Sequence, residues 1–134
     1  MLKTTPIITV TAAIIEKDGR ILAARKRDGL HLAGYWEFPG GKLEAHETPE
    51  DCLRRELTEE LGIHCEIGPF LAESLHDYGT KIIRLLGFHA RHTRGDFHLT
   101  DHDAIRWLTA EELATVQWAP ADIPLVDALI SKLG

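Results

Sequence analysis

Residues 41–63 read GKLEAHETPEDCLRRELTEELGI and contain one clearly delimited helix. Thr48, Pro49 and the two acids after them are typical of a helix N-terminus. The hydroxyl caps free amides, proline fits the first helical position, and acids favour the positive end of the helix dipole. Gly62 is a residue that commonly ends a helix. We therefore expect one helix between Thr48 and Gly62.

Three carboxylates share one face of this expected helix. Because each residue turns the helix by about 100°, Glu56, Glu59 and Glu60 fall within roughly a third of its circumference. The adjoining stripe consists of Leu53, Leu57 and Leu61. Clustered carboxylates raise one another's pKa unless a cation compensates, and oxygen-only ligands favour Mg²⁺ or Mn²⁺. Glu47, in the preceding segment, can fold back to join them. The simpler interpretation is a solvated, Glu-rich surface helix.

Strands are predicted on both sides of the helix, where apolar, often β-branched runs alternate with turn signals. The expected strands are residues 7–15, 21–25, 35–38, 63–75, 81–91 and 105–108. A short helix within 110–116 and a longer one within 122–133 are expected near the C-terminus. Because strands and helices are mixed, we expect an α/β protein with one sheet covered by helices on both faces.

Composition limits the function classes. The 134 residues, 44% apolar and 27% charged, fit a single domain over residues 1–134. A net charge of −6 argues against binding a nucleic acid polymer. There is no apolar run long enough for a bilayer, so we expect a cytoplasmic protein without a membrane partner, as a monomer or weak dimer. Two cysteines, Cys52 and Cys65, are too few for a disulfide framework and are expected to be reduced.

The spacing within residues 41–63 resembles the Nudix box: G, five residues, E, seven residues, then REUxEExGU, where U is aliphatic. The matching positions are Gly41, Glu47, Arg55, Glu56, Leu57, Glu59, Glu60, Gly62 and Ile63. A solvated helix does not require this spacing. The stretch WEFPGGK at residues 36–42 resembles the MutT-like subfamily, and APADIP at 119–124 resembles its CTP pyrophosphohydrolase-type members.

This resemblance implies an α/β/α sandwich with a mixed β-sheet between helices. It also implies a Mg²⁺-dependent hydrolase, with Mn²⁺ as a possible replacement. The expected reaction converts nucleoside triphosphates, such as 8-oxo-dGTP or CTP and dCTP derivatives, to the monophosphate and pyrophosphate, in sanitation of the nucleotide pool. The alternatives are a Nudix hydrolase of ADP-ribose or a dinucleoside polyphosphate, and a nucleotide-binding module without turnover.

The resemblance also implies residue roles at the metal site. The implied metal ligands are the carboxylates of Glu56, Glu59 and Glu60, with Glu47 in support and the carbonyl of Gly40. Arg55 would orient the carboxylates. The general base is either Glu56 or Asp101, which resembles an acidic position that the subfamily carries after the box. Asp101 also fits a turn residue that caps backbone donors.

Phosphate contacts are expected from Lys42 and from the cluster Arg25, Lys26 and Arg27. In a strand Lys26 points away from the other two, so only one set can face the site. The subfamily generally has arginine where Lys26 aligns, and lysine lacks the bidentate fork of arginine, so Arg25 or Arg27 would substitute. The simpler interpretation is solvated surface charge.

Base recognition is expected from Phe38 or Trp36 as an apolar wall and from Asp122 as the polar group. As an ionised acid Asp122 would only accept hydrogen bonds, which suits amino groups or the N7 hydrogen of 8-oxoguanine. It aligns with an asparagine that reads 8-oxoguanine in MutT proteins. The alternative is that Asp122 caps the final helix.

Overall fold

Two long strands, β1 (Ile7–Lys17) and β2 (Arg20–Lys26), form an N-terminal hairpin in the computed structural model, which describes residues 4–133. At its tip Asp18 and Gly19 have φ of 52° and 75°. Positive φ at both central residues is the requirement of a type I′ hairpin turn. The strands expected over residues 7–15 and 21–25 are therefore present and pair with each other as a hairpin.

The sheet is mixed, with strand order β3-β2-β1-β5-β4 and β6 paired to β2. The remaining strands are β3 (Trp36–Glu37), β4 (His64–Asp77), β5 (Ile82–Arg94) and β6 (His102–Leu108). β1 and β5 run parallel, and the other pairs are antiparallel. β6 begins three residues before the expected 105, and its pairing places His102 beside Lys26 across a bulge.

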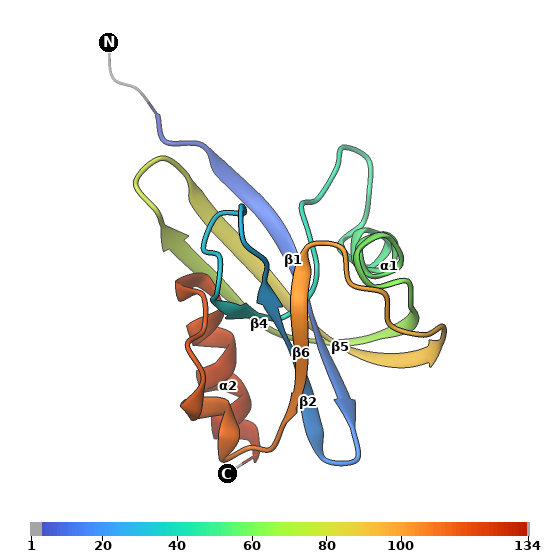
Figure 1. Cartoon of the computed structure of the whole chain (residues 1–134). Coiled ribbons are helices and arrows are strands. Elements are labelled where there is room, and N and C mark those ends of the chain that lie inside the picture. The colour runs from blue at the N-terminus through green and yellow to red at the C-terminus, as the bar shows by residue number, and fades with distance from the viewer. Residues whose placement is uncertain (1–3, 134) are drawn as a thin grey trace.

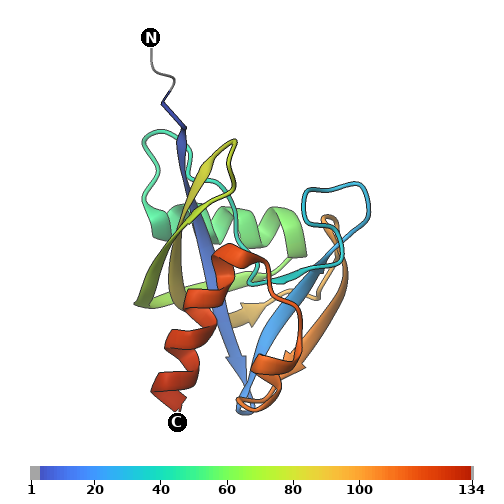
Figure 2. The same ribbon diagram turned by 90° about the vertical axis from the view of Figure 1, so that its left-hand side faces the viewer.

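Two helices cover opposite faces of this sheet, as Figures 1 and 2 show: α1 (Pro49–Leu61) and α2 (Ile123–Leu133). The leucine stripe of α1 packs in the same core as Ala13 of β1, whereas α2 packs in the same core as Ala12. The two cores therefore lie on the two faces of one strand, and the expected α/β/α sandwich is confirmed. The expected short helix is a 3₁₀ turn, Glu112–Thr115, and a second one, Pro120–Asp122, precedes α2.

The ends of α1 are formed by the residues that the sequence indicates. Thr48 accepts a hydrogen bond from the backbone N–H of Asp51 at 3.1 Å. Gly62 has a φ of 70°, and its N–H bonds back to the last turn. Cys52 and Cys65 are both buried and free, as expected. Neither helix of the described chain has the length and apolar character that a bilayer crossing requires.

Candidate active site

Two glycines let the segment before α1 approach β1 and α1 closely. The carbonyls of Pro39 and Gly41 accept from the amides of Ala13 and Thr11, both at 2.8 Å. Successive carbonyls of an extended chain point to opposite sides, so the carbonyl of Gly40 points away from β1. A Cβ on Gly40 would overlap the backbone of Thr11, and one on Gly41 would overlap the carboxyl group of Glu56. Gly40 therefore has no room for a side chain, and Gly41 has room only if the end of the Glu56 side chain moves.

Arg55 is the centre of a network of carboxylates. Its guanidinium donates to both oxygens of Glu47, at 2.7 and 2.9 Å, to Glu56 at 2.8 Å and to Glu59 at 3.2 Å. It also donates to the carbonyl of Lys42 at 3.2 Å. Together these bonds fasten the preceding loop to α1, which is the orienting position that the sequence predicts for Arg55.

Glu60 lies on the adjacent side of α1 and lines a cavity of about 360 Å³, which we call the acidic chamber. The other residues that line it are Val10, Lys26, Leu30, His31, Glu37, Gly40, Gly41 and Asp101. Burial, followed by the negative charges of Glu37, Glu56 and Asp101, raises the pKa of Glu60 to about 9. Its Oε2 atom is buried and has no hydrogen-bond partner among the described residues. A bound cation would stabilise the negative charge of a carboxylate in this position.

A second cavity of about 180 Å³ adjoins the first, and we call it the Asp122 chamber. Four residues line both chambers: Val10, Lys26, His31 and Glu37. The residues that line only the second are Leu32, Tyr78, Lys81, Ile83, Leu85, Ala119, Ala121 and Asp122. The two chambers therefore form one cleft with an acidic end and a mainly apolar end.

The strand alternation in the basic cluster places Lys26 in the cleft. Its Nζ lies 4.0 Å from Oε1 of Glu37. Arg25 instead donates to Asp103 at 2.6 Å, and its guanidinium lies 5.7 Å from the centre of the Trp36 ring. Arg25 is therefore held outside the cleft. It does not substitute for the arginine that the subfamily generally has at the position of Lys26.

Arg27 and Lys42 also lie outside the set of residues that line the cleft. The Nε of Arg27 donates to the carbonyl of Thr100 at 2.9 Å, next to Asp101. The side chain of Lys42 is exposed, and its described contacts are through the backbone, where its carbonyl accepts from Arg55. The direct phosphate contact expected from these two residues is thus not supported by their placement.

Neither Phe38 nor Trp36, the residues expected to form an apolar wall for the base, lines the cleft. Phe38 is only 3% exposed and packs on Trp118, with ring centres 4.6 Å apart. Trp36 alternates with Glu37 in β3, so the carboxylate faces the cleft and the indole ring faces Arg25 and Arg106. The base end is instead lined by Tyr78 and His31, whose rings make an edge-on contact at 5.5 Å.

Asp122 is buried at the apolar end of the cleft. Its Oδ2 accepts from the backbone N–H of Phe38 at 2.9 Å, and no bond from it to an α2 amide is present in residues 4–133. Burial and the charge of Glu37 raise its pKa well above the usual range. The expectation of a permanently ionised acceptor is therefore corrected: the protonated carboxyl group is favoured here, and it can donate as well as accept.

The sequence does not single out four residues that line the cleft: Glu37, His31, Tyr78 and Lys81. It also does not single out the buried His102, which contacts Glu37 from outside the cleft. Glu37 is the one with a visible signal, since it is a single charge between the aromatic residues Trp36 and Phe38. Tyr78 lies within a segment that resembles an ordinary turn, and Lys81 follows that segment. Only the β4–β5 pairing brings the two residues to the cleft.

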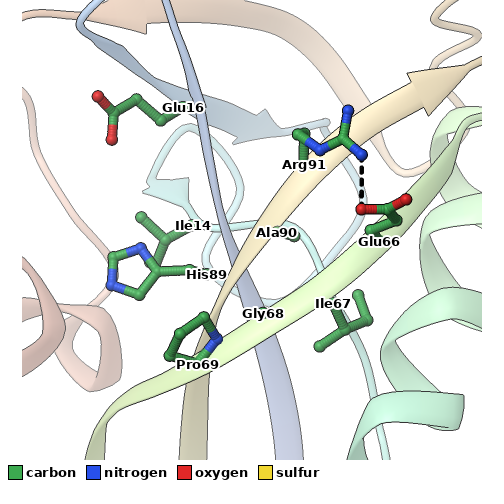
Figure 3. Close-up of a pocket in the computed structure, with 9 residues that line it drawn as sticks. All are labelled: Ile14, Glu16, Glu66, Ile67, Gly68, Pro69, His89, Ala90 and Arg91. Atoms are coloured by element: carbon green, nitrogen blue, oxygen red, sulfur yellow. Dashed lines mark hydrogen bonds and ion pairs between the residues drawn. The ribbon is translucent and has the colours of Figure 1, made fainter.

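A separate cavity of about 360 Å³ lies against β4 and β5 (Figure 3). Arg91 and Glu66 form an ion pair at 2.6 Å on its rim, and His89 and Pro69 also line it. None of its nine lining residues belongs to the cleft or to the predicted site. The acidic chamber is lined by two of the predicted carboxylates, Glu60 and Asp101, and by the predicted Gly40. The other three, Glu47, Glu56 and Glu59, are bonded to Arg55 and do not line it.

Residues 5–129 match the NUDIX domain family. The chain belongs to the Nudix family. It is 41% identical over 125 residues to a CTP pyrophosphohydrolase of Escherichia coli, covering 93% of each chain. It is 38% identical over 116 residues to a putative 8-oxo-dGTP diphosphatase 2 of Mycobacterium tuberculosis, covering 84% of this chain and 81% of that one. The solution structure of the E. coli ORF135 protein superposes with a TM-score of 0.86 at 39% identity, covering 97% of this chain and 93% of that one.

Nudix hydrolases generally use divalent metal ions, and the donor set of this chain fits one. The acidic residues that line the acidic chamber, Glu37, Glu60 and Asp101, offer oxygen donors. One of these oxygens, Oε2 of Glu60, is buried without a partner among the described residues. Within residues 4–133, however, no three acidic, histidine or cysteine side chains are assembled around one point. Three of the predicted carboxylates, those of Glu47, Glu56 and Glu59, accept from the guanidinium of Arg55 instead.

Proposed function

We propose that this chain is a Mg²⁺-dependent Nudix pyrophosphohydrolase of nucleoside triphosphates, which releases the nucleoside monophosphate and pyrophosphate. The observation that carries the proposal is the continuity of the cleft. An acidic chamber with an unpaired carboxylate oxygen at Glu60 opens into a chamber that ends at Asp122. This arrangement suits a molecule with a polyanionic end and a flat, polar-edged base.

The residues proposed to hold the metal are Glu56, Glu59 and Glu60, with the Gly40 carbonyl as a further oxygen and Glu47 in support. Hard oxygen donors favour Mg²⁺, and Mn²⁺ is the expected substitute. When bound, the cation would compensate the charge of the phosphates and polarise the phosphoryl oxygens under attack. Without such compensation, carboxylates this close would repel a triphosphate.

The remaining chemistry falls to side chains of the protein. Lys26 is proposed to bind a phosphate oxygen, because it is the cation that lines both chambers within residues 4–133. Water attacks a phosphorus atom of the anhydride, its proton passes to a carboxylate, and the bond between the α- and β-phosphates breaks. Glu56 is proposed as that base, and Asp101, across the acidic chamber, is the alternative. Arg55 keeps Glu56 in place through its bond at 2.8 Å.

Cytidine nucleotides are the proposed substrates. The Asp122 chamber is small, about 180 Å³, which favours a single-ring base. A protonated carboxyl group pairs with the N3 acceptor and the amino donor of cytosine. The relative named as a CTP pyrophosphohydrolase, 41% identical, supports the same choice. We propose that the enzyme acts in the cytoplasm, as a monomer or weak dimer, on the nucleotide pool.

A second candidate is 8-oxo-dGTP, favoured by the relative named as a putative 8-oxo-dGTP diphosphatase at 38% identity. The O6 and N7–H groups of 8-oxoguanine also match a carboxyl group that donates and accepts. Unmodified guanine has no N7 hydrogen, so it offers two acceptors instead.

The test is hydrolysis of CTP, dCTP, 8-oxo-dGTP, dGTP, ADP-ribose and a dinucleoside polyphosphate, each with Mg²⁺ and with a chelator. Chromatography of the products detects pyrophosphate from the triphosphates, ribose 5-phosphate and AMP from ADP-ribose, and two nucleotides from the dinucleoside polyphosphate. We expect Mg²⁺-dependent release of pyrophosphate from cytidine triphosphates at the highest kcat/KM. Faster turnover of ADP-ribose or the dinucleoside polyphosphate would overturn the substrate class. Binding of nucleotides without any turnover would instead support the non-catalytic module.

A further inference from the structure

Glu37 stands at the junction of the two chambers. Its backbone is fixed on both sides: the N–H and carbonyl of Trp36 bond to Gln117 and Ala119, and the N–H of Phe38 donates to Asp122. Its side chain is 25% exposed, and it lines both the acidic chamber and the Asp122 chamber. A carboxylate is thus held rigidly at the point where the two halves of the cleft meet.

His102 fixes the orientation of this carboxylate. Its Nε2 lies 2.8 Å from Oε2 of Glu37, and since the carboxylate accepts, the hydrogen is on Nε2. The His102 side chain is fully buried, and its Nδ1 has no partner among the described residues. Burying an unpaired polar atom is destabilising, so this histidine is costly as a packing residue. Its contact with Glu37 is the feature that offsets that cost.

One oxygen of Glu37 remains available to a ligand. Oε2 is taken by His102, and Oε1 faces Lys26 at 4.0 Å. The ammonium group on that side disfavours a cation at Oε1, and the negative charge of Glu37 disfavours a phosphate. A neutral hydroxyl group is repelled by neither charge, and it can donate a hydrogen bond to Oε1. In a nucleotide bound with its phosphates at Glu60 and its base at Asp122, the group at the junction is the sugar, whose hydroxyls are such donors.

We propose that Glu37, positioned by His102, accepts a hydrogen bond from a sugar hydroxyl of the substrate and thereby determines specificity at the sugar. This inference rests on the proposed function, because it takes the occupant of the cleft to be a nucleoside triphosphate. Glu37 is then a specificity-determining residue and His102 its positioning residue.

The test compares kcat/KM for the ribo, 2′-deoxy, 3′-deoxy and 2′,3′-dideoxy triphosphates of the base that the wild type hydrolyses best. For the wild type, loss of the hydroxyl that Glu37 binds is expected to lower kcat/KM by about 10- to 100-fold, the range of a hydrogen bond to a charged group. The two singly deoxy substrates identify which hydroxyl is bound. In Glu37→Ala the ratio between hydroxyl-bearing and dideoxy substrates is expected to fall to about 1.

His102 is tested by a pair of variants. In His102→Leu, which keeps the carboxylate but removes its donor, the sugar ratio is expected to fall by about 5-fold or more. In His102→Gln, whose amide can donate to Glu37, the ratio of kcat/KM between hydroxyl-bearing and dideoxy substrates is expected to lie close to the wild-type value. Glu66→Ala removes an exposed carboxylate outside the cleft, so it serves as the matched control with an unchanged ratio.

Each outcome decides a different point. A wild type that hydrolyses dideoxy and hydroxyl-bearing substrates equally well would overturn the inference while leaving the proposed function intact. An unchanged sugar ratio in folded Glu37→Ala, or a uniform loss on every substrate, would do the same. If circular dichroism shows that Glu37→Ala is unfolded, Glu37→Gln takes its place, with an expected ratio reduced to between about 2 and 10. A wild type that releases no pyrophosphate from any triphosphate would remove both proposals.

Discussion

Arg55 donates to both carboxylate oxygens of Glu47, at 2.7 and 2.9 Å, across eight residues of sequence. Oε1 of Glu47 also accepts from the backbone N–H of Glu44 at 3.0 Å. These bonds lower the pKa of Glu47 to about 2, with the side-chain bond to Arg55 as the largest cause. The pair therefore links the loop that follows Gly41 to the middle of α1, and it does so only while Glu47 is ionised.

The first prediction concerns acid stability. Because the folded pKa of Glu47 lies near 2 and its ordinary value is 4.5, its contribution is complete above about pH 4.5 and disappears as the pH falls toward 2. Glu47→Gln is therefore expected to be less stable than the wild type at pH 7, with a difference that shrinks between pH 4.5 and 2. Urea unfolding across this range measures it, with Glu16→Gln, an exposed position of β1, as the control. If the stability difference between the wild type and Glu47→Gln stayed constant down to pH 2, ionisation of Glu47 would be excluded as its cause.

The second prediction separates the two candidate bases. Glu56→Gln keeps the size of the side chain and its hydrogen bond to Arg55, so the fold is expected to stay intact while kcat falls by about 10²- to 10⁴-fold. Glu59, whose side chain is 59% exposed, is the matched position, and Glu59→Gln is expected to lose less. Saturating pyrophosphate-release kinetics with Mg²⁺ give kcat directly. If Glu56→Gln retains near wild-type kcat and Asp101→Asn does not, the role of base passes to Asp101.

The third prediction concerns Asp122. Since its pKa is raised in the folded state, the unfolded chain loses the proton first, and the contribution of Asp122 to stability falls as the pH rises above about 3.8. Asp122→Asn removes this ionisation, so it is expected to be more stable than the wild type at pH 7 and to have a flatter pH profile. With its oxygen on the Phe38 amide, asparagine would offer the base only N–H donors. Two N–H donors suit the two acceptors of guanine better than the acceptor and donor of cytosine, so the preference of kcat/KM for dCTP over dGTP is expected to fall by about 10-fold.

These two readouts decide between roles for Asp122. A changed stability profile with an unchanged base preference would make it a purely structural residue of the cleft floor. A changed preference at both pH 6 and pH 8, with thermal unfolding confirming the fold, would support base reading. Tyr35→Phe, outside the residues that line the cleft, is the control for the assay.

Local features of this molecule were readable from the sequence because they depend on neighbours in the chain. Thr48 and Gly62 delimit α1, and the spacing of Glu56 and Glu60 places both on the side of α1 next to its buried stripe. The turn at Asp18 and Gly19 is local in the same sense. For such features a few residues determine the backbone, and the sequence contains all of them.

The contacts that give the cleft its character are long-range, and no local pattern determines them. The register of β2 and β6, with its bulge at Lys26, brings His102 to Glu37 over 65 residues. Asp122 bonds to the Phe38 amide over 84 residues, a contact that neither base recognition nor the alternative of a helix cap predicts from the sequence. Alternation along β2 predicts that Lys26 and Arg25 face opposite ways, but only the packing of β3 and β6 decides which side is the cleft.

The last prediction uses the two adjacent glycines before α1, which differ in what an added methyl group would meet. At Gly40 it would overlap the backbone of Thr11 in the central strand, which has no room to move. Gly40→Ala is therefore expected to lower the free energy of unfolding by about 1–3 kcal/mol or more. At Gly41 the methyl group would meet the end of the Glu56 side chain, which can rotate away. Gly41→Ala is thus expected to remain folded but to lose about 10²-fold in kcat, because the carboxylate is displaced by about 1 Å or more. Urea unfolding, measured on both variants, should therefore show the larger loss of stability for Gly40→Ala, and pyrophosphate release should show that Gly41→Ala loses kcat although it stays folded. If Gly41→Ala kept full kcat, the placement of Glu56 against this loop would have no part in catalysis.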